Sequence, residues 1–509
     1  MKPFTAPLDD ILFSLRHVAE AEKLSMFDAE LTQEIGQHFA SFAEAELAPL
    51  DETGDLQGCS LIDGRIKMPD GFAEAYRDYA EQGWPGLTAP EAFGGQALDD
   101  LTLCVTSEIF SGANHSLQMV TGLVPGAVRT LLAHGTPEQQ ATFIPRLASG
   151  QDLATMCLTE PGAGSDLSRI HCKATEQGEV WSITGEKIFI SGGDQDLSQG
   201  IQHLVLARTS DDGVKGLSLF LCPSETATGA RNPITVTRIE EKMGLHASPT
   251  CQMAFDGAEA QLIGRVGGGL AAMFTMMNHA RIDVALQGVA HASRAYDIAH
   301  SYAAERVQGR KSDRSDAMLI DHADVARMLD DIDILAVGAR AIAHLCIVTL
   351  EEGTNPDLVE FLTPIAKVAG SEAGIRAAEL GMQVLGGYGY LREYRLEQTY
   401  RDARITAIYE GANGIHERAL ATRHAEGAAG DAFADYIDAT DAPAVKRWHT
   451  LREKLAKSAH PDTLAHEFAN ASRDALLSGL WQKIATVADQ HPNSERMKRI
   501  SRIALDRLG

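Results

Sequence analysis

The spacing of apolar positions changes twice along this chain of 509 residues. Up to about residue 155, segments rich in Ala, Glu and Leu, such as Leu31 to Leu50, alternate with short glycine and proline stretches, which is typical of helices. Between about residues 156 and 262, short apolar runs are separated by clusters of Gly, Asp and Ser, which predicts antiparallel strands. The runs are Ile188 to Ile190, Leu204 to Ala207, Leu217 to Leu221, Ile234 to Val236 and Met253 to Phe255.

Helical spacing returns from about residue 268, where apolar residues recur at intervals of threes and fours. They include Ile282, Leu286, Val289, Tyr296 and Ala299. Thr363-Pro364 predicts a further helix start, because proline is favoured at the first helical position. The buried stripe of that helix would be Val368, Ile375, Ala378, Met382 and Leu385.

These changes predict four segments. Residues 1–155 are helical, residues 156–262 form an inserted β domain, residues 263–424 are helical again, and residues 425–509 form a linker with a helical extension. The stretch AEGAAGDAFADYIDATDAP at the start of the last segment is interpreted as the linker. Charged positions in the helices that follow indicate a solvated face.

Composition excludes several classes of protein. The formal net charge of -25 argues against a protein that binds the nucleic-acid backbone and against adsorption to anionic membranes. The seven cysteines are scattered and never spaced as CxxC, which favours reduced thiols over a disulfide framework or a zinc site. Asp9, Asp10 and Arg16 interrupt any signal-peptide apolar region, and no stretch reads as apolar enough to span a bilayer. We therefore predict a cytoplasmic protein.

Tyr409-Glu410-Gly411 is the strongest candidate for chemistry, because a carboxylate lies between an aromatic ring and a glycine that permits close approach. Alone, it would be interpreted as an ordinary surface glutamate at a turn. Three other segments accompany it: MCLTEPGAGSD from Met156, ITGEKIFISGG from Ile183 and QVLGGYGY from Gln383. The chain has no GxxxxGK phosphate loop, no HExxH zinc helix and no GxSxG elbow, and we predict no metal site.

In this order and spacing, these segments resemble the acyl-CoA dehydrogenase family of FAD enzymes, over roughly residues 30 to 425. The resemblance implies an α+β, mainly α fold with an N-terminal helical domain, a middle antiparallel β domain and a C-terminal four-helix bundle. Here an extra C-terminal helical segment follows. It also implies that Glu410 removes the α proton of an acyl-CoA while the flavin accepts the β hydride, which yields a trans-2-enoyl-CoA.

Some family members carry the base on the helix that here contains Asn278-His279-Ala280-Arg281. Ala280 occupies that position and cannot take a proton, which favours Glu410. By the same resemblance, the substrate would contact Ser165, Arg281, Tyr409 and Gly411. Arg281 could instead be a solvent-exposed helix arginine.

The resemblance implies two sets of FAD-binding residues. The set around TEPGAGSD and KIFIS is Met156, Leu158, Thr159, Gly164, Ser165, Phe189 and Ser191. A second set would reach FAD held mainly by a neighbouring subunit, and it is Arg306, Gln308, Gln383 and Gly387. This arrangement implies a homodimer or homotetramer. Arg306 could also be a helix-end arginine favoured by the helix dipole.

Two departures from the family pattern affect the substrate and the cofactor contacts. Ala412 stands where many members have threonine, and ERVQGR lacks the usual aromatic-glycine pair and precedes a polar insertion, Lys311 to Asp316. RVQGR, the SGG after KIFI, and MFTMMNHAR are shared with the branch that includes 3-methylmercaptopropionyl-CoA dehydrogenases. The substrate would be 3-methylmercaptopropionyl-CoA or a short or medium acyl-CoA. Electrons would pass to an electron-transfer flavoprotein. An acyl-CoA oxidase that uses oxygen, and a flavoprotein of the same fold with a binding role, remain alternatives.

Overall fold

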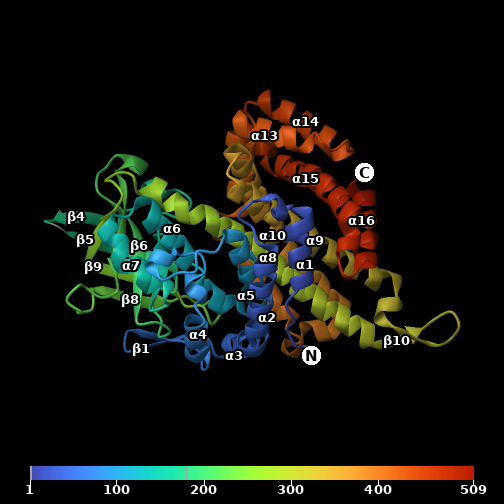
Figure 1. The fold of residues 1–509 in the computed structure, drawn as a ribbon, viewed down its shortest axis with the longest axis horizontal. Helices are drawn as coiled ribbons and strands as arrows, with labels where there is room; N and C mark the ends of the chain where they lie inside the picture. The colour runs from blue at the N-terminus through green and yellow to red at the C-terminus, as the bar shows by residue number, and fades with distance from the viewer. Residues whose placement is uncertain (1–2, 179, 509) are drawn as a thin grey trace. The chain divides into compact units, whose positions relative to one another are not determined.

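The computed structural model describes residues 3–178 and 180–508, and the chain divides into two compact units (Figure 1). Unit 1 comprises Met1–Ala48, Asp99–Ala113 and Arg281–Gly509. Unit 2 comprises Pro49–Leu98 and Asn114–Ala280. Each unit therefore gathers segments that are far apart in sequence. The division into four consecutive segments remains a prediction.

Unit 2 contains a seven-stranded sheet in the order β3-β6-β4-β5-β9-β7, with β8 paired to β9. Because β7 also pairs with β6, the sheet closes on itself. The five apolar runs expected to be strands all lie in strands of this sheet. The strands are β3 (Asp152–Cys157), β4 (Lys173–Gln177), β5 (Val180–Ser191), β6 (Gly200–Arg208), β7 (Leu217–Pro223), β8 (Ile234–Ile239) and β9 (Thr250–Ile263).

Most pairs in the sheet are antiparallel, as predicted, but β3 runs parallel to β6 from Asp152↔Gly200 to Cys157↔Val205. Parallel neighbours need a long crossover between them. The antiparallel hairpin of β4 and β5 lies in that crossover. Apolar runs alone do not reveal which strand a run will pair with, so the sequence pattern missed this pair.

A short hairpin interrupts the segment that was expected to be helical. It consists of β1 (Ser60–Ile62) and β2 (Arg65–Lys67), joined by Asp63-Gly64, both with positive φ. Two such residues are typical of the tight turn that suits twisted strands. The Asp194 carboxylate accepts hydrogen bonds from Arg65 Nε and Ile66 N, both at 2.9 Å. The hairpin is thus tied to the loop that follows β5.

The other elements of unit 2 are mostly helices. They are α3 (Ala48–Gln57), which starts one residue before the unit, α4 (Phe72–Glu81), α6 (Val124–His134) and α7 (Pro137–Ala148). At the start of α7, the Thr136 side chain accepts from Gln139 N, and the Gln139 side chain accepts from Thr136 N. This reciprocal capping satisfies backbone groups that the first turn leaves unpaired.

Unit 1 is a helical bundle that includes α8 (Gly269–Glu305, from Arg281), α9 (Ala323–Glu352) and α10 (Pro356–Leu385). Glycines let α8 and α10 pack with their backbones in contact. A Cβ on Gly288 of α8 would lie 2.1 Å from Gly370 O of α10. Any side chain at Gly288 would therefore push these two helices apart.

The remaining elements of unit 1 are mostly short helices. They include α1 (Leu8–Phe13), α2 (Ala29–Phe42), the first part of α5 (Asp100–Thr121), α11 (Leu396–Ala403) and α12 (Asn413–Ala419). The β10–β11 hairpin (Val307–Arg310 and Asp316–Met318) follows α8 and extends away from the helices of its unit (Figure 1).

The expectation that no stretch is apolar enough to span a bilayer is wrong for α9. By length and composition, α9 could cross a membrane, and 89% of its most apolar window is buried inside the protein. A helix surrounded by other helices needs apolar residues on every face. Burial in the bundle accounts for its composition.

The predicted helix start at Thr363-Pro364 is also wrong. Helix α10 begins at Pro356, where the Asn355 side chain caps Leu358 N at 3.0 Å. Pro364 lies inside the helix, and the buried Thr363 hydroxyl donates to Val359 O at 2.8 Å. Proline does favour a first turn, but the Asn-Pro pair eight residues earlier has both a cap and a proline.

Residues 428–437 form helix α13 (Ala428–Ile437) rather than a linker. Phe433 of α13 is buried and stacks on Phe361 of α10, with ring centroids 4.2 Å apart. Trp448 and Phe468 complete this aromatic cluster. They come from α14 (Pro443–Ala456) and α15 (Ala465–Val487), which are followed by α16 (Ser494–Leu508). The extension therefore packs as an integral part of unit 1.

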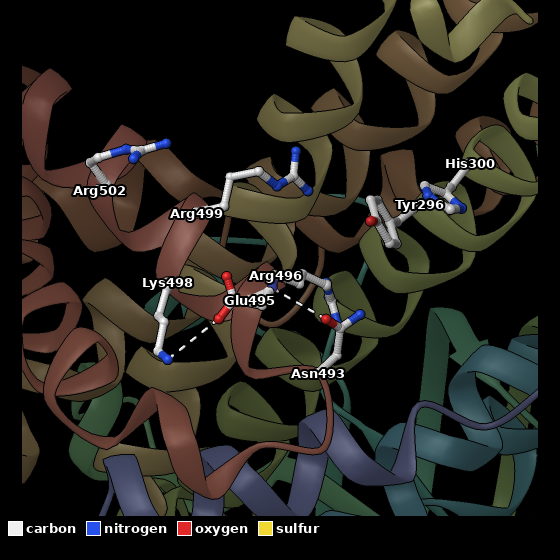
Figure 2. Close-up of a pocket in the computed structure, with 8 residues that line it drawn as sticks. All are labelled: Tyr296, His300, Asn493, Glu495, Arg496, Lys498, Arg499 and Arg502. Atoms are coloured by element: carbon white, nitrogen blue, oxygen red, sulfur yellow. Dashed lines mark hydrogen bonds and ion pairs between the residues drawn. The ribbon is translucent and has the colours of Figure 1, made fainter.

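Helix α16 is held by a network of ion pairs. Arg496 Nη1 lies 2.7 Å from Asp10 Oδ1, and Arg496 Nη2 lies 2.6 Å from Asp333 Oδ1. Asp10 belongs to α1 and the fully buried Asp333 to α9, so one guanidinium joins three helices. Figure 2 shows Arg496 and Arg502 on α16, beside an open hollow that Tyr296 and His300 of α8 also line.

We expect Arg496→Met to lower the free energy of unfolding by about 3–5 kcal/mol, because it removes the cation that pairs with the buried Asp333 carboxylate and one of the cations that contact Asp10. Arg502→Met is the matched control. Arg502 is exposed and has no ion pair or hydrogen bond with any residue in the described ranges. Thermal and urea unfolding of both variants would test this. Equal effects of the two substitutions would contradict it.

Candidate active site

The loop between α11 and α12 carries Glu410. After α11, a short 3-10 turn, Arg404–Ala407, leads into Ile408 and Tyr409. Glu410 has φ 53° and Gly411 has φ 93°, so two successive residues adopt left-handed conformations. Glycine tolerates this freely, whereas glutamate does not. The surrounding structure must therefore hold Glu410 in place, which is common for residues at functional sites.

Side chains of α10 and α12 provide that support. Lys367 Nζ donates to Gly411 O at 2.8 Å and to Asn413 Oδ1 at 2.9 Å. His416 Nε2 lies 3.0 Å from Glu410 O, to which it donates as the Nε2–H tautomer. A Cβ on Gly411 would lie 2.7 Å from His416 Nε2, so glycine is required sterically here. The backbone on both sides of the Glu410 carbonyl is thus fixed.

The Glu410 carboxylate is half-buried, and its Oε2 is shielded from solvent without a hydrogen-bond partner in the described residues. Burial raises the pKa of Glu410 to about 7, with a further rise from Asp283 and opposing effects of Arg281 and Lys367. A carboxyl with a pKa near neutrality is suited to general-base chemistry.

The cationic groups near Glu410 are affected by the same burial. Burial lowers the pKa of Lys367 to about 8, although the Glu410 carboxylate opposes this. Burial also lowers the pKa of the Arg281 guanidinium, again opposed by Glu410. Burial lowers the pKa of His416 to about 4, so its imidazole is neutral at neutral pH. Glu410 therefore lies in a partly desolvated cluster that contains two cations.

Tyr409 points into a chain of hydrogen bonds. Its hydroxyl donates to Gln287 Oε1, and Gln287 Nε2 donates to Asp283 Oδ2 at 2.9 Å. The Ser107 hydroxyl donates to the other oxygen of Asp283. Burial raises the pKa of Tyr409 well above its usual range, so its hydroxyl stays protonated. This chain fixes the ring next to Glu410 and links α5 and α8 to the loop.

The sequence-predicted residues fall into separate sets. Glu410, Tyr409, Gly411 and Arg281 belong to one cluster in unit 1. The seven residues predicted around TEPGAGSD and KIFIS all lie in unit 2. Among them, Met156 is in β3, Leu158 is buried directly after β3, and Gly164 is exposed.

Three hydroxyls of the unit 2 set have no hydrogen-bond partner within residues 3–178 and 180–508. They are those of Thr159, Ser165 and Ser191. A Cβ on Gly164 would meet no atom within 4 Å, so protein packing does not require a glycine there. Free hydroxyls and an open glycine fit a segment that presents hydrogen bonds to a ligand.

Phe189 is held in an unusual position. Its side chain is 59% exposed and its φ is 58°. The pairing of β5 with β9 is irregular between Lys187 and Ile190, so Phe189 lies on a bulge. A bulge redirects a side chain out of the regular alternation of a strand. An exposed aromatic ring on a strained backbone fits contact with a flat ligand such as an isoalloxazine ring.

A buried ion pair supports the TEPGAGSD segment. Lys187 Nζ donates to Glu160 Oε1, Leu158 O and Leu206 O, all within 2.9 Å, and both charged side chains are buried. The Glu160 carboxylate also accepts from Cys172 N at 3.0 Å. Charges buried in this way are stable only with such complete pairing. Lys187 and Glu160 thus hold the loop without occupying its free hydroxyls.

The third predicted set lies at the end of α10 and on β10. The Arg306 guanidinium lies over the Tyr388 ring, 5.2 Å from its centroid. Gln308 is exposed, and its carbonyl accepts from His322 Nε2 at 2.7 Å. Gln383 and Gly387 are exposed as well, and a Cβ on Gly387 would meet nothing within 4 Å. Arg306 is therefore near the GGYGY turn, and its role in FAD binding remains a prediction.

The residues present fit a bound FAD. Unit 2 offers an exposed aromatic ring and three hydroxyls that are unpaired among the described residues, and Arg306, directly before β10, is an exposed arginine suited to a pyrophosphate. Sequence reasoning missed Lys367, His416, Gln287 and the Lys187–Glu160 pair. A lone lysine in the apolar stretch FLTPIAKVAG was a signal for Lys367. No local signal marked Gln287.

Glu410→Gln should stabilise the folded protein at alkaline pH. Because the folded-state pKa lies above the usual value of 4.5, wild-type stability decreases as pH rises through the window from 4.5 to about 7. The glutamine variant lacks this penalty. We expect Glu410→Gln to raise the free energy of unfolding by about 1–2 kcal/mol near pH 8 and by almost nothing near pH 4. The value at pH 8 is reduced because solvent partly screens a half-buried group.

Thermal unfolding of wild type, Glu410→Gln and the exposed control Glu393→Gln across this pH range would measure the difference. A gain that is the same at both ends of the range would argue against a raised pKa. So would an equal pH-dependent gain in the control.

Comparisons with known proteins agree with this geometry. The chain matches the acyl-CoA dehydrogenase N-terminal domain over residues 29–151, the middle domain over residues 155–258 and the C-terminal domain over residues 267–425. It is 37% identical to 3-methylmercaptopropionyl-CoA dehydrogenase of Ruegeria pomeroyi, over 96% of this chain and 86% of that protein. It is 32% identical to a broad-specificity linear acyl-CoA dehydrogenase of Mycobacterium tuberculosis, over 82% of this chain and 74% of that one.

Solved structures show the same fold. Butyryl-CoA dehydrogenase from Megasphaera elsdenii has a TM-score of 0.68 and 25% identity, over 77% of this chain and 97% of that one. ACDH-11 of Caenorhabditis elegans has a TM-score of 0.83 at 20% identity, over 99% of this chain and 92% of that one. The chain therefore belongs to the acyl-CoA dehydrogenase family, flavoprotein oxidoreductases that act on CH–CH donors.

Proposed function

We propose that the protein is an FAD-dependent acyl-CoA dehydrogenase in which Glu410 removes the α proton of a bound acyl thioester. The observation that carries this proposal is the half-buried carboxylate whose Oε2 lacks a partner and whose pKa lies near 7. Such an oxygen is free to accept a proton from carbon. Bound FAD would supply the hydride acceptor for the β hydrogen, so that a trans-2-enoyl-CoA results.

The neighbouring residues would orient the thioester. Arg281 and Lys367 favour the ionised, basic form of Glu410 before reaction. Gln287 holds the Tyr409 ring, which can form one wall of the acyl site. Gly411 leaves room beside the carboxylate, and the family resemblance assigns a substrate contact to Ser165 as well.

The FAD would be held by Met156, Leu158, Thr159, Gly164, Ser165, Phe189 and Ser191 of one subunit. Arg306, Gln308, Gln383 and Gly387 would reach the FAD of a neighbouring subunit in a homodimer or homotetramer. The exposure of Arg306, Gln308 and Gly387 supports this assignment, because these groups are not covered by their own chain. Cytoplasmic localisation is part of the same proposal.

The substrate we propose is 3-methylmercaptopropionyl-CoA or a short or medium straight-chain acyl-CoA. The first is favoured by the similarity to the Ruegeria pomeroyi enzyme across nearly the whole chain. A butyryl-CoA dehydrogenase of Syntrophomonas wolfei, 32% identical over 72% of this chain, supports the second. An electron-transfer flavoprotein would accept the electrons. An oxidase is not favoured, since the relatives that are 37% and 32% identical are named as dehydrogenases, and the intact Glu410 cluster argues against a purely binding role.

Glu410→Gln should lower the rate of flavin reduction by acyl-CoA at least about 100-fold, because general-base catalysis typically contributes that much. The glutamine keeps the size of the side chain, so bound yellow flavin should be retained. Anaerobic stopped-flow bleaching measures the rate, and the flavin spectrum checks cofactor binding. Full activity in Glu410→Gln would overturn the assignment. Glu393→Gln is the control.

The purified enzyme should reduce an artificial dye or an electron-transfer flavoprotein much faster than it releases hydrogen peroxide. A panel of acyl-CoAs of graded length, with methylthiopropionyl-CoA among them, would be compared in both assays. Peroxide release that matches substrate consumption would instead identify an oxidase. The thioester with the highest kcat/KM would decide between the two proposed substrates.

A further inference from the structure

Lys367 is a lysine in the middle of α10 with no exposed surface. Burying an ammonium is costly unless its donors are satisfied. It has three N–H donors, and two reach Gly411 O and Asn413 Oδ1. The first acceptor belongs to the residue directly after Glu410, and the second belongs to the first residue of α12. The helix therefore carries a buried charge whose hydrogen bonds go to the backbone of the candidate catalytic loop and to a side chain at the start of α12.

A second contact strengthens this attachment. Asn413 Nδ2 donates to Ser371 Oγ at 3.0 Å, and Ser371 lies one turn along α10 from Lys367. Asn413 is thus held at both ends of its amide by α10, because its oxygen accepts from Lys367. Since Asn413 is also the first residue of α12, the attachment fixes where α12 begins. The strained Glu410 conformation lies just before this fixed point.

The charge of Lys367 acts on Glu410 as well. The groups that influence Glu410 are Arg281 and Asp283 from α8, and Lys367 from α10. His416 of α12 is neutral near pH 7 because burial lowers its pKa to about 4. Lys367 is influenced in turn by Glu410, Arg281 and Glu372. Near neutral pH it remains mostly protonated, because its pKa is about 8.

We propose that Lys367 is a positioning residue for the reaction, which holds the loop carrying Glu410 and keeps that carboxylate ionised before substrate is deprotonated. The inference rests on the proposed role of Glu410. It differs from a purely structural role in one respect: it ties Lys367 to the proton affinity of Glu410. A lysine that merely filled space would not affect that quantity.

The direct test is a titration of Glu410 in the holoenzyme without substrate. Infrared difference spectra would follow the protonated carboxyl band that is absent in Glu410→Gln. Lys367→Met preserves most of the side-chain volume while removing the charge and the donors. We expect it to raise the Glu410 pKa by about one unit, because removing a neighbouring cation favours the protonated acid. The acidic limb of flavin reduction should move by the same amount.

Two further variants refine the comparison. Lys367→Arg keeps the charge, so the Glu410 titration should remain closer to wild type even if the loop fits less well. Lys446→Met removes an exposed cation of α14, with 76% of its side chain exposed, and should leave the titration unchanged. A Glu410 titration that is the same in wild type and Lys367→Met would overturn the proposal.

A folding defect in Lys367→Met would not leave the question open. The double variant Lys367→Met/Glu410→Gln removes the carboxylate that has lost its cation, so it should unfold at a higher temperature than Lys367→Met alone. Strictly additive effects of the two substitutions would contradict the coupling. If Glu410→Gln kept full activity, the proposed function would fail, yet the titration would still report whether Lys367 controls the proton affinity of Glu410.

Discussion

Partial burial of one carboxylate is the constraint on which the candidate catalytic region of unit 1 depends. A buried oxygen without a hydrogen bond is unfavourable, and Glu410 Oε2 has no hydrogen-bond partner in the described part of the chain. The bundle offsets this cost with cations instead of hydrogen bonds to that oxygen. Arg281 and Lys367 oppose the rise in pKa while Oε2 remains free to react. The close packing of α8 on α10 at Gly288 and Gly370 brings the helices that carry these two cations together.

The two units use the same device to shape a loop. In unit 2, buried Lys187 donates to the carbonyls of Leu158 and Leu206 and to Glu160. In unit 1, buried Lys367 donates to the Gly411 carbonyl and to Asn413. In each case a buried ammonium group holds the backbone of the loop through hydrogen bonds to a carbonyl oxygen. The groups that would meet a ligand, the Thr159 hydroxyl and the Glu410 carboxylate, take no part in the fixing. A loop can thus be rigid and still present unpaired polar atoms, which is what pre-organised binding requires.

The sequence predicted the features that depend on local pattern and failed where distant segments decide. Apolar runs located five strands. The parallel pairing of β3 with β6, more than forty residues away, could not be predicted from them. Residues 428–437 were predicted to be part of a linker, yet the Phe433 ring stacks on the Phe361 ring of α10. Glu410 was found because its neighbours resemble a family motif. Lys367 and Gln287 were missed because their role appears only when α10 and α8 are packed around the loop.

The C-terminal extension shows that the net charge of the whole chain does not describe the charge of each helix. In a chain of net charge -25, α16 is basic, and it faces the acidic side of α9. Arg496 pairs with Asp333, Arg499 with Asp330 and Arg507 with Asp331. Asp10 of α1 shares Arg496, so the first and last helices are joined through one guanidinium. The domain matches to the family end at residue 425, whereas the fold similarity to ACDH-11 covers 99% of the chain. The extension therefore completes the surface of the bundle, because without α16 the carboxylates of Asp330 and Asp333 on α9 would lose the arginines that pair with them.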